Sequence, residues 1–222
     1  EWLQKYLKAI GINPTNNVVD ITNYVLHAIG QPMHAFDAAA IDGQKVIVKN
    51  LEEGTSFTTL DEKERKLFAE DLMICSEKGG LCIAGVFGGI NSGVTEKTTT
   101  VFLESAYFSA DSIRKTAQRH QLKTDAAFRY ERGTDPNLTL YALKYAAQLI
   151  LEIAGGRVVG QIHDIYPQPI ENFLIDVSYS RINQLIGKKL STREVDEILA
   201  GLEIQQENKT EENFTAIVTP YR

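Results

Sequence analysis

Residues 121–136 read Gln-Leu-Lys-Thr-Asp-Ala-Ala-Phe-Arg-Tyr-Glu-Arg-Gly-Thr-Asp-Pro, and no other stretch says more about how this chain is built. Most of these side chains are polar, yet an apolar helical pattern follows them without a flexible linker. Such a segment is poor core material, and it is too aromatic to be a disordered tail. Because binding groups are often held at the edges of ordered elements, we expect a functional site here.

Two further motifs accompany this segment. Residues 16–37 read N-N-V-V-D-I-T-N-Y-V-L-H-A-I-G-Q-P-M-H-A-F-D, and residues 83–94 read I-A-G-V-F-G-G-I-N-S-G-V. With T-D-A-x-x-R-Y-E-R-G-x-D-P of the first segment, they resemble, in order and spacing, the editing domain of the β subunit of bacterial phenylalanyl-tRNA synthetase. The resemblance spans about residues 1–166 and continues more weakly to the end.

Composition limits the class of protein. The 222 residues are 43% hydrophobic and 23% charged, as is ordinary for soluble globular proteins, and no apolar run or signal pattern predicts a membrane segment. We expect a cytoplasmic protein. The net charge of −6 argues against a general DNA or RNA binder, although a local basic patch could contact RNA. The chain lacks an initiator Met and ends abruptly at Arg222, so we expect a piece of a longer polypeptide.

Periodicity predicts an α+β fold. We expect helices over 2–10, 17–29, 109–120 and 136–154, with strands over 45–49, 56–60, 71–76, 81–86 and 101–106. Asn17 is the expected N-cap of the second helix, and Asp135 that of the fourth. The stripe of the fourth helix expected to face the core is Leu140, Leu143, Ala147, Ile150 and Ala154.

A second domain is predicted after the linker 166–169, where two prolines stop regular structure. Residues 1–166 are the predicted editing domain. The pattern of residues 170–222 predicts a strand, two helices and a strand, with a capping box from Ser191 to Glu194. The resemblance implies a small, truncated winged-helix-like α+β domain. It also implies that the family's magnesium ligands lie beyond Pro220-x-Arg222, so no metal or other cofactor is expected in this piece, whereas the full enzyme should use ATP and Mg²⁺.

Cys75 and Cys82 are the only cysteines, and both lie in apolar surroundings. Neither has a second Cys or a His at ligand spacing. We expect buried, reduced thiols with no disulfide and no metal.

Glu104 lies in the apolar strand pattern Val-Phe-Leu-Glu-Ser-Ala, where a carboxylate is costly unless it is paired. Spacing alone leaves a surface Glu, a structural ion pair and a functional group equally open. The resemblance implies that Glu104 lines the editing pocket and recognises the phenolic hydroxyl of a mischarged tyrosine. His34 follows a turn set by Pro32, and a lone His is more often structural. The resemblance assigns His34 to the same pocket.

The other predicted pocket residues come from two motifs. Thr124 offers a hydroxyl that can hold water or a substrate oxygen, and Ala126 offers space for a ring. In the glycine-rich motif, backbone amides of Ala84, Gly85 and Gly88 are expected to form a wall beside the substrate. That motif is no phosphate loop, because no Gly-Lys-Ser/Thr follows.

Charged residues flank the signature. Arg114, Lys115, Arg119 and Lys123, together with His120, are either a solvated face or a contact to tRNA phosphates. Four signature residues are expected to form mutual salt bridges, namely Asp125, Arg129, Glu131 and Arg132. His27 and His163 are expected to be structural.

The resemblance implies post-transfer editing, which is hydrolysis of tyrosyl-tRNA-Phe. Thr124 and His34 are its expected catalytic residues, and the expected partners are tRNA-Phe and the synthetic α subunit in an α2β2 heterotetramer. The sequence offers no Ser or Cys nucleophile with an adjacent base, and no obvious general base. Two alternatives remain, namely a non-catalytic scaffold that holds tRNA on the synthetic subunit and a stand-alone amino-acid or RNA binding module.

Overall fold

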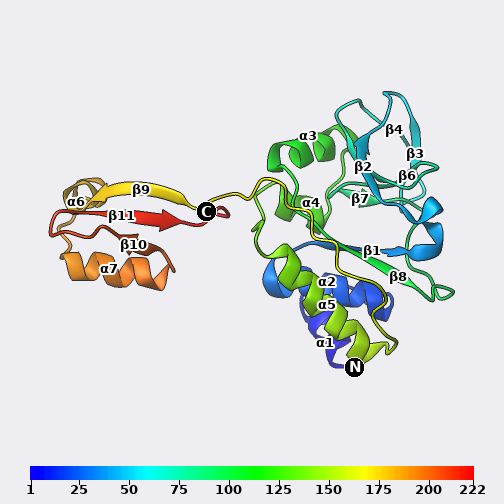
Figure 1. Ribbon diagram of the computed structural model, residues 1–222, viewed down its shortest axis with the longest axis horizontal. Helices are drawn as coiled ribbons and strands as arrows, with labels where there is room; N and C mark the ends of the chain where they lie inside the picture. The colour runs from blue at the N-terminus through cyan, green and yellow to red at the C-terminus, as the bar shows by residue number, and fades with distance from the viewer. The chain divides into compact units, whose positions relative to one another are not determined.

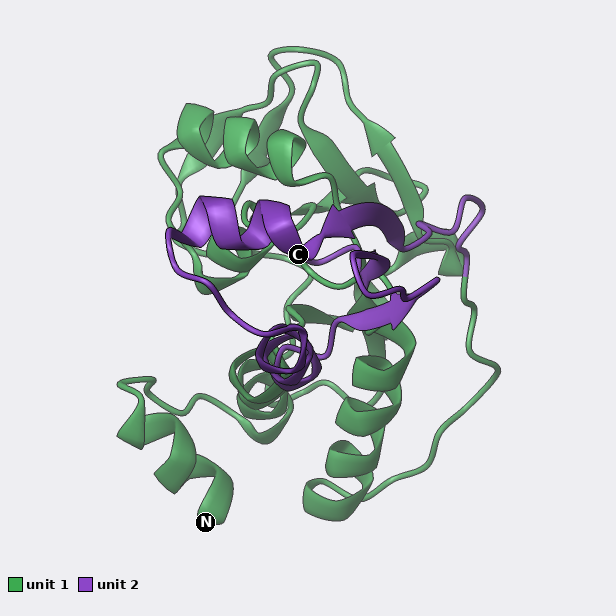
Figure 2. Ribbon diagram, turned by 90° about the vertical axis from the view of Figure 1, so that its left-hand side faces the viewer, with its two compact units in different colours: residues 1–164 green, residues 165–222 purple.

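The computed structural model describes residues 1–222 and divides into two compact units, 1–164 and 165–222 (Figure 2). The division falls beside the proline-containing segment 166–169. Both units combine helices with antiparallel sheets, which confirms the predicted α+β class. No helix is both long enough and apolar enough to cross a bilayer.

The first unit contains five helices, eight strands and two short 3₁₀ turns. They are α1 Trp2–Ala9, α2 Asn17–Ile29, β1 Met33–Asp37, η1 Ala38–Ala40, η2 Asp42–Gln44, β2 Ile47–Asn50, β3 Ser56–Thr58, β4 Glu64–Lys66, β5 Leu72–Cys75, β6 Gly80–Ile83, β7 Phe87–Gly88, β8 Val101–Ser105, α3 Ala110–His120, α4 Asp125–Tyr130 and α5 Thr139–Ile153.

The antiparallel ribbon of β1 and β8 runs through the middle of this unit (Figure 1). Met33 and Leu103 pack on the helical cluster of α1, α2 and α5. Phe36 belongs instead to the core around the four-stranded sheet, whose order is β2-β5-β6-β7. The ribbon therefore separates two hydrophobic layers, and side chains on its sheet-facing side meet the β6–β7 hairpin.

The helical layer corrects the predicted core stripe of α5. The fully buried residues are Ala142, Ala146 and Leu149, while Ala154 is exposed. Two alanines, one turn apart, let the α5 backbone approach α2 closely, so Ala142 and Ala146 lie at the contact. The helix α5 starts at Thr139 rather than at the predicted residue 136. Asp135 does not cap it, because its side chain accepts the Asn137 N–H at 2.9 Å in a preceding turn.

The sheet layer is covered by α3 and α4, which contribute Ile113, Ala117, Ala127 and Tyr130 to its core. Asp71 is fully buried at the start of β5 and fastens α3 to the sheet. Its carboxylate accepts a hydrogen bond from the Thr116 hydroxyl at 2.9 Å and lies 2.6 Å from the His120 ring. The end of α3 that leads into the 121–136 segment is thus fixed to the sheet.

The first half of the signature is helical, which the sequence analysis did not predict. The Thr124 hydroxyl accepts the N–H of Ala127 at 3.1 Å and caps α4, while Ala127 and Tyr130 turn inward. A six-residue helix with many polar side chains shows no clear apolar stripe, so its period is hidden in the sequence. The second helix is likewise capped by Asn16 rather than Asn17, through the Val19 N–H at 2.9 Å.

The second unit contains β9 Phe173–Ser178, α6 Tyr179–Ile186, α7 Thr192–Gly201, β10 Gln205–Glu207 and β11 Asn213–Val218. Its sheet order is β10-β11-β9, and a small core forms around Tyr179, Val195 and Phe214. The capping box of Ser191 and Glu194 is present as predicted. The strand β10 is additional to the predicted elements.

Candidate functional site

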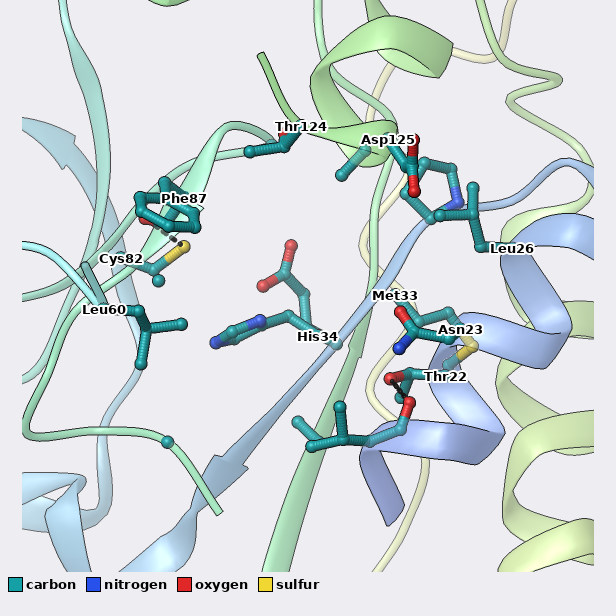
Figure 3. A pocket seen from close by; sticks show the side chains of 18 of the residues that line it. Thr22, Asn23, Leu26, Met33, His34, Leu60, Cys82, Phe87, Thr124 and Asp125 are labelled. Atoms are coloured by element: carbon teal, nitrogen blue, oxygen red, sulfur yellow. Dashed lines mark hydrogen bonds between the residues drawn. The ribbon is translucent and has the colours of Figure 1, made fainter. Parts of the chain in front are cut away.

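A cavity of about 470 Å³ opens in the first unit between the β1–β8 ribbon, α2, the β6–β7 hairpin and the start of α4 (Figure 3). The predicted site residues on its wall are His34, Gly85, Gly88, Glu104, Thr124 and Ala126. Three separate motifs of the sequence therefore meet around one cavity.

Glu104 and His34 are directly opposite each other on the antiparallel ribbon, so their side chains leave the same face. Glu104 Oε2 and His34 Nε2 are both buried and have no hydrogen-bond partner. Burial raises the pKa of Glu104 to about 8 and lowers the pKa of His34 to about 4. Near neutral pH the cavity therefore holds an uncharged carboxyl and an uncharged imidazole, each able to bond to a ligand hydroxyl.

Thr124 and Ala126 enter the cavity from the first turn of α4. The Thr124 hydroxyl donates its single hydrogen to Val86 O at 2.9 Å and accepts the Ala127 N–H. It can therefore offer a ligand only its remaining lone pair. The Ala126 methyl leaves room on the same wall.

The glycine-rich motif contributes space rather than a row of free amides. A Cβ at Gly88 would lie 3.0 Å from His34 Cε1 and 2.9 Å from Leu60 Cδ1, so the absence of a side chain keeps the imidazole in place. Gly85 has a φ of +65° and faces the core side chains Phe108 and Ile113. The prediction for Ala84 is wrong, because this residue is buried in the core and its N–H is bonded to Leu72 O.

Asn23 is a cavity residue that the sequence analysis missed. It lies on α2 beside Thr22 (Figure 3). The Thr22 hydroxyl donates its hydrogen to Val19 O at 2.8 Å, whereas the Asn23 amide makes no hydrogen bond within the chain. The sequence did contain a signal, because an Asn on the apolar helix pattern V-V-D-I-T-N-Y-V needs a polar partner.

The thiol of Cys82 also lines the cavity. Burial first, and then the charge of Glu104, hold the pKa of this thiol well above its usual value, so it is not a nucleophile at neutral pH. Both cysteines are free and buried. No group of three or more His, Cys, Asp or Glu side chains is arranged to hold a metal ion.

Two arginines of the predicted basic cluster are already paired with acidic residues of the chain. Arg114 pairs with Asp111 at 2.8 Å, and Arg119 pairs with Glu70 at 3.0 Å. The prediction for His120 is wrong, since it is buried against Asp71 rather than presented to phosphates. Lys115 and Lys123 remain exposed and without an ion-pair partner.

Only part of the predicted set of mutual salt bridges within the signature is present. Glu131 and Arg132 form a pair, but Asp125 faces His27 Nε2 at 3.7 Å, and Arg129 has no acidic partner. Arg129 is therefore the arginine of this segment that forms no ion pair.

Comparison with known proteins gives this chain its family. Residues 1–155 match the B3/4 domain, so the chain belongs to the B3/4 domain family. It is 53% identical over its whole length to phenylalanine–tRNA ligase β subunits of Bacteroides fragilis and, over 223 aligned residues, of Porphyromonas gingivalis. It is 43% identical to that of Bdellovibrio bacteriovorus. These matches confirm the resemblance, and the chain spans 27% of the length of each relative.

One solved structure is also similar, an N-terminal fragment of the phenylalanyl-tRNA synthetase β subunit from Pyrococcus horikoshii. It matches with a TM-score of 0.42 and 15% identity, over 92% of this chain and 60% of that one.

Proposed function

We propose that the cavity of this B3/4 domain edits mischarged tRNA by hydrolysing the ester of tyrosyl-tRNA-Phe, as part of a phenylalanine–tRNA ligase β subunit. The observation that carries the proposal is the pair of buried, unpartnered atoms, Glu104 Oε2 and His34 Nε2, aimed into one cavity.

Selectivity for the tyrosyl over the phenylalanyl ester follows from the hydrogen bonds that those two atoms lack within the chain. An apolar pocket rejects a substrate with one extra hydroxyl by only about a hundredfold, whereas a site that requires the hydroxyl can discriminate far more strongly. A phenolic hydroxyl can both donate and accept, so it can bond to the Glu104 carboxyl and the His34 imidazole together. A phenylalanyl side chain would leave both groups buried without partners, at about 1–3 kcal/mol each. The correct product is therefore spared.

Hydrolysis uses water as the nucleophile. The water oxygen bonds to the ester carbonyl carbon, the bond from that carbon to the ribose oxygen breaks, and the proton lost by water ends on the ribose oxygen. The free lone pair of Thr124 can hold the water or a ribose hydroxyl, and the unpaired Asn23 amide can hold the ester. Positioning and a neighbouring tRNA hydroxyl supply the catalysis, since the Cys82 thiol is held protonated.

The partners follow from the family. We propose tRNA-Phe as the substrate carrier and an α subunit as the synthetic partner, in an α2β2 assembly in the cytoplasm. Phenylalanine activation, with its ATP and Mg²⁺, belongs to parts of the full enzyme outside these 222 residues. Residues 170–222 are proposed as the winged-helix-like domain that follows the editing domain. Lys115 and Lys123 are retained as candidate phosphate contacts.

The rival is a non-catalytic scaffold that packs on the synthetic subunit and holds tRNA. Buried polar groups without partners destabilise a fold, and a scaffold has no use for them. The Glu104 and His34 pair therefore favours a ligand-binding cavity over a purely structural domain.

The experiment is a deacylation assay with the two-subunit enzyme and preformed tyrosyl-tRNA-Phe and phenylalanyl-tRNA-Phe. Editing predicts loss of the tyrosyl ester well above the spontaneous rate and near-spontaneous loss of the phenylalanyl ester. A scaffold predicts the spontaneous rate for both.

A further inference from the structure

The outer side of α4 carries an exposed stripe that begins at the cavity. Asp125, Phe128 and Arg129 of α4, with Arg132 in the turn that follows it, are all exposed, whereas Ala127 and Tyr130 are buried. Asp125 is itself part of the cavity wall. The stripe therefore leads from the mouth of the cavity over the neighbouring surface.

Two members of the stripe form a preorganised stack. The guanidinium of Arg132 lies 3.5 Å from the centroid of the Phe128 ring, and it donates a hydrogen bond to Phe128 O at 3.0 Å. A contact to Glu131 fixes it further. The Phe128 residue is nevertheless 50% exposed and the Arg132 side chain 55% exposed. A flat cation held on an aromatic ring at the surface can take a further planar group.

Arg129 supplies a guanidinium without an ion pair beside this stack. It is exposed and has no ion pair, unlike Arg114 and Arg119 on α3, which face acids at 2.8 and 3.0 Å. In a chain with a net charge of −6, an unpaired arginine next to the cavity is a local feature that suits an anion.

We propose that Phe128, Arg129 and Arg132, here termed the α4 platform, bind the single-stranded 3′ end of the RNA that carries the aminoacyl ester. A base stacks on the Arg132–Phe128 pair, and a phosphate contacts Arg129. The occupant is RNA because an ester seated in the cavity must bring its own ribose and the preceding nucleotides to the cavity mouth. This inference rests on the proposed function and names the surface through which its substrate is held.

The test uses deacylation of tyrosyl-tRNA-Phe by the two-subunit enzyme carrying Phe128→Ala or Arg129→Ala. Loss of a stacked base should raise KM about 5- to 150-fold in Phe128→Ala, with little change in kcat. Arg129→Ala should raise KM and flatten the dependence of log(kcat/KM) on log[salt] by about 0.7. Phe128→Tyr keeps the ring and should behave as the wild type.

Controls separate RNA contact from damage to the cavity. Arg157→Ala removes an exposed arginine of the same unit that has no ion pair and does not line the cavity, and it should leave KM unchanged. Binding of free tyrosine, which lacks RNA, should be the same in all variants. An unchanged KM for tyrosyl-tRNA-Phe in both alanine variants would overturn the platform, and so would an equal loss of tyrosine binding. Failure of the wild type itself to deacylate would instead refute the proposed function.

Discussion

The first unit should lose stability as the pH is raised from 6.5 to 9, and the change Glu104→Gln should remove most of that loss. Burial raises the pKa of Glu104 from 4.5 to about 8, so the folded protein keeps a proton that the unfolded chain releases. Between these values the unfolded state binds fewer protons, and the free energy of unfolding therefore falls with rising pH. The two pKa values give a fall of about 2 kcal/mol between pH 6.5 and 9.

His34 contributes with the opposite sign but in a lower range. Burial lowers its pKa from 6.5 to about 4, so the unfolded state binds more protons between these values and stability rises with pH there. Above about pH 6.5 this contribution is nearly complete. The alkaline fall that Glu104→Gln removes therefore belongs to Glu104, whose charge also raises the pKa of Cys82.

Urea unfolding followed by tryptophan fluorescence measures this effect. Trp2 is the only tryptophan, and it packs edge-on to Tyr24 at 5.2 Å, so its emission reports on the first unit. The wild type should lose about 2 kcal/mol relative to Glu104→Gln between pH 6.5 and 9. Parallel pH profiles for the two proteins would refute a neutral, buried Glu104.

Three further changes test other parts of the cavity and its surroundings. Ala126→Trp should fill the cavity and abolish deacylation while circular dichroism shows a folded protein, and deacylation at the original rate would contradict a size-limiting role. Gly88→Ala should push the His34 ring aside and lower kcat/KM for the tyrosyl ester about 10- to 100-fold, and wild-type activity would show that His34 tolerates the shift. Replacing both Lys115 and Lys123 with Ala should flatten the salt dependence of tRNA binding by about 0.7 to 0.9 per lost contact, whereas an unchanged slope identifies a solvated face.

Much of the architecture was predictable because its elements have strong local patterns. The apolar periodicity of α2 and the capping box before α7 both act within one or two turns of the chain, and both appear in the structure. The strand β8 is also found where alternation placed it.

The missed elements depend on partners far away in the sequence. β1 is a five-residue strand whose partner, β8, starts 64 residues after β1 ends, so nothing local marks it as a strand. That pairing is also what brings His34 opposite Glu104, and no spacing rule could reveal it. Ala84 was misplaced for a related reason, since the motif indicates close packing but not which side of the hairpin faces the cavity.

The central claim is that Glu104 reads the hydroxyl that separates tyrosine from phenylalanine. It is tested most directly by kcat/KM for deacylation of tyrosyl-tRNA-Phe and phenylalanyl-tRNA-Phe, measured for the two-subunit enzyme with Glu104 or with Glu104→Ala. Loss of this buried hydrogen bond should reduce the preference for the tyrosyl ester by about 1–3 kcal/mol, or about 5- to 150-fold. An unchanged preference would contradict the assignment of hydroxyl recognition to Glu104.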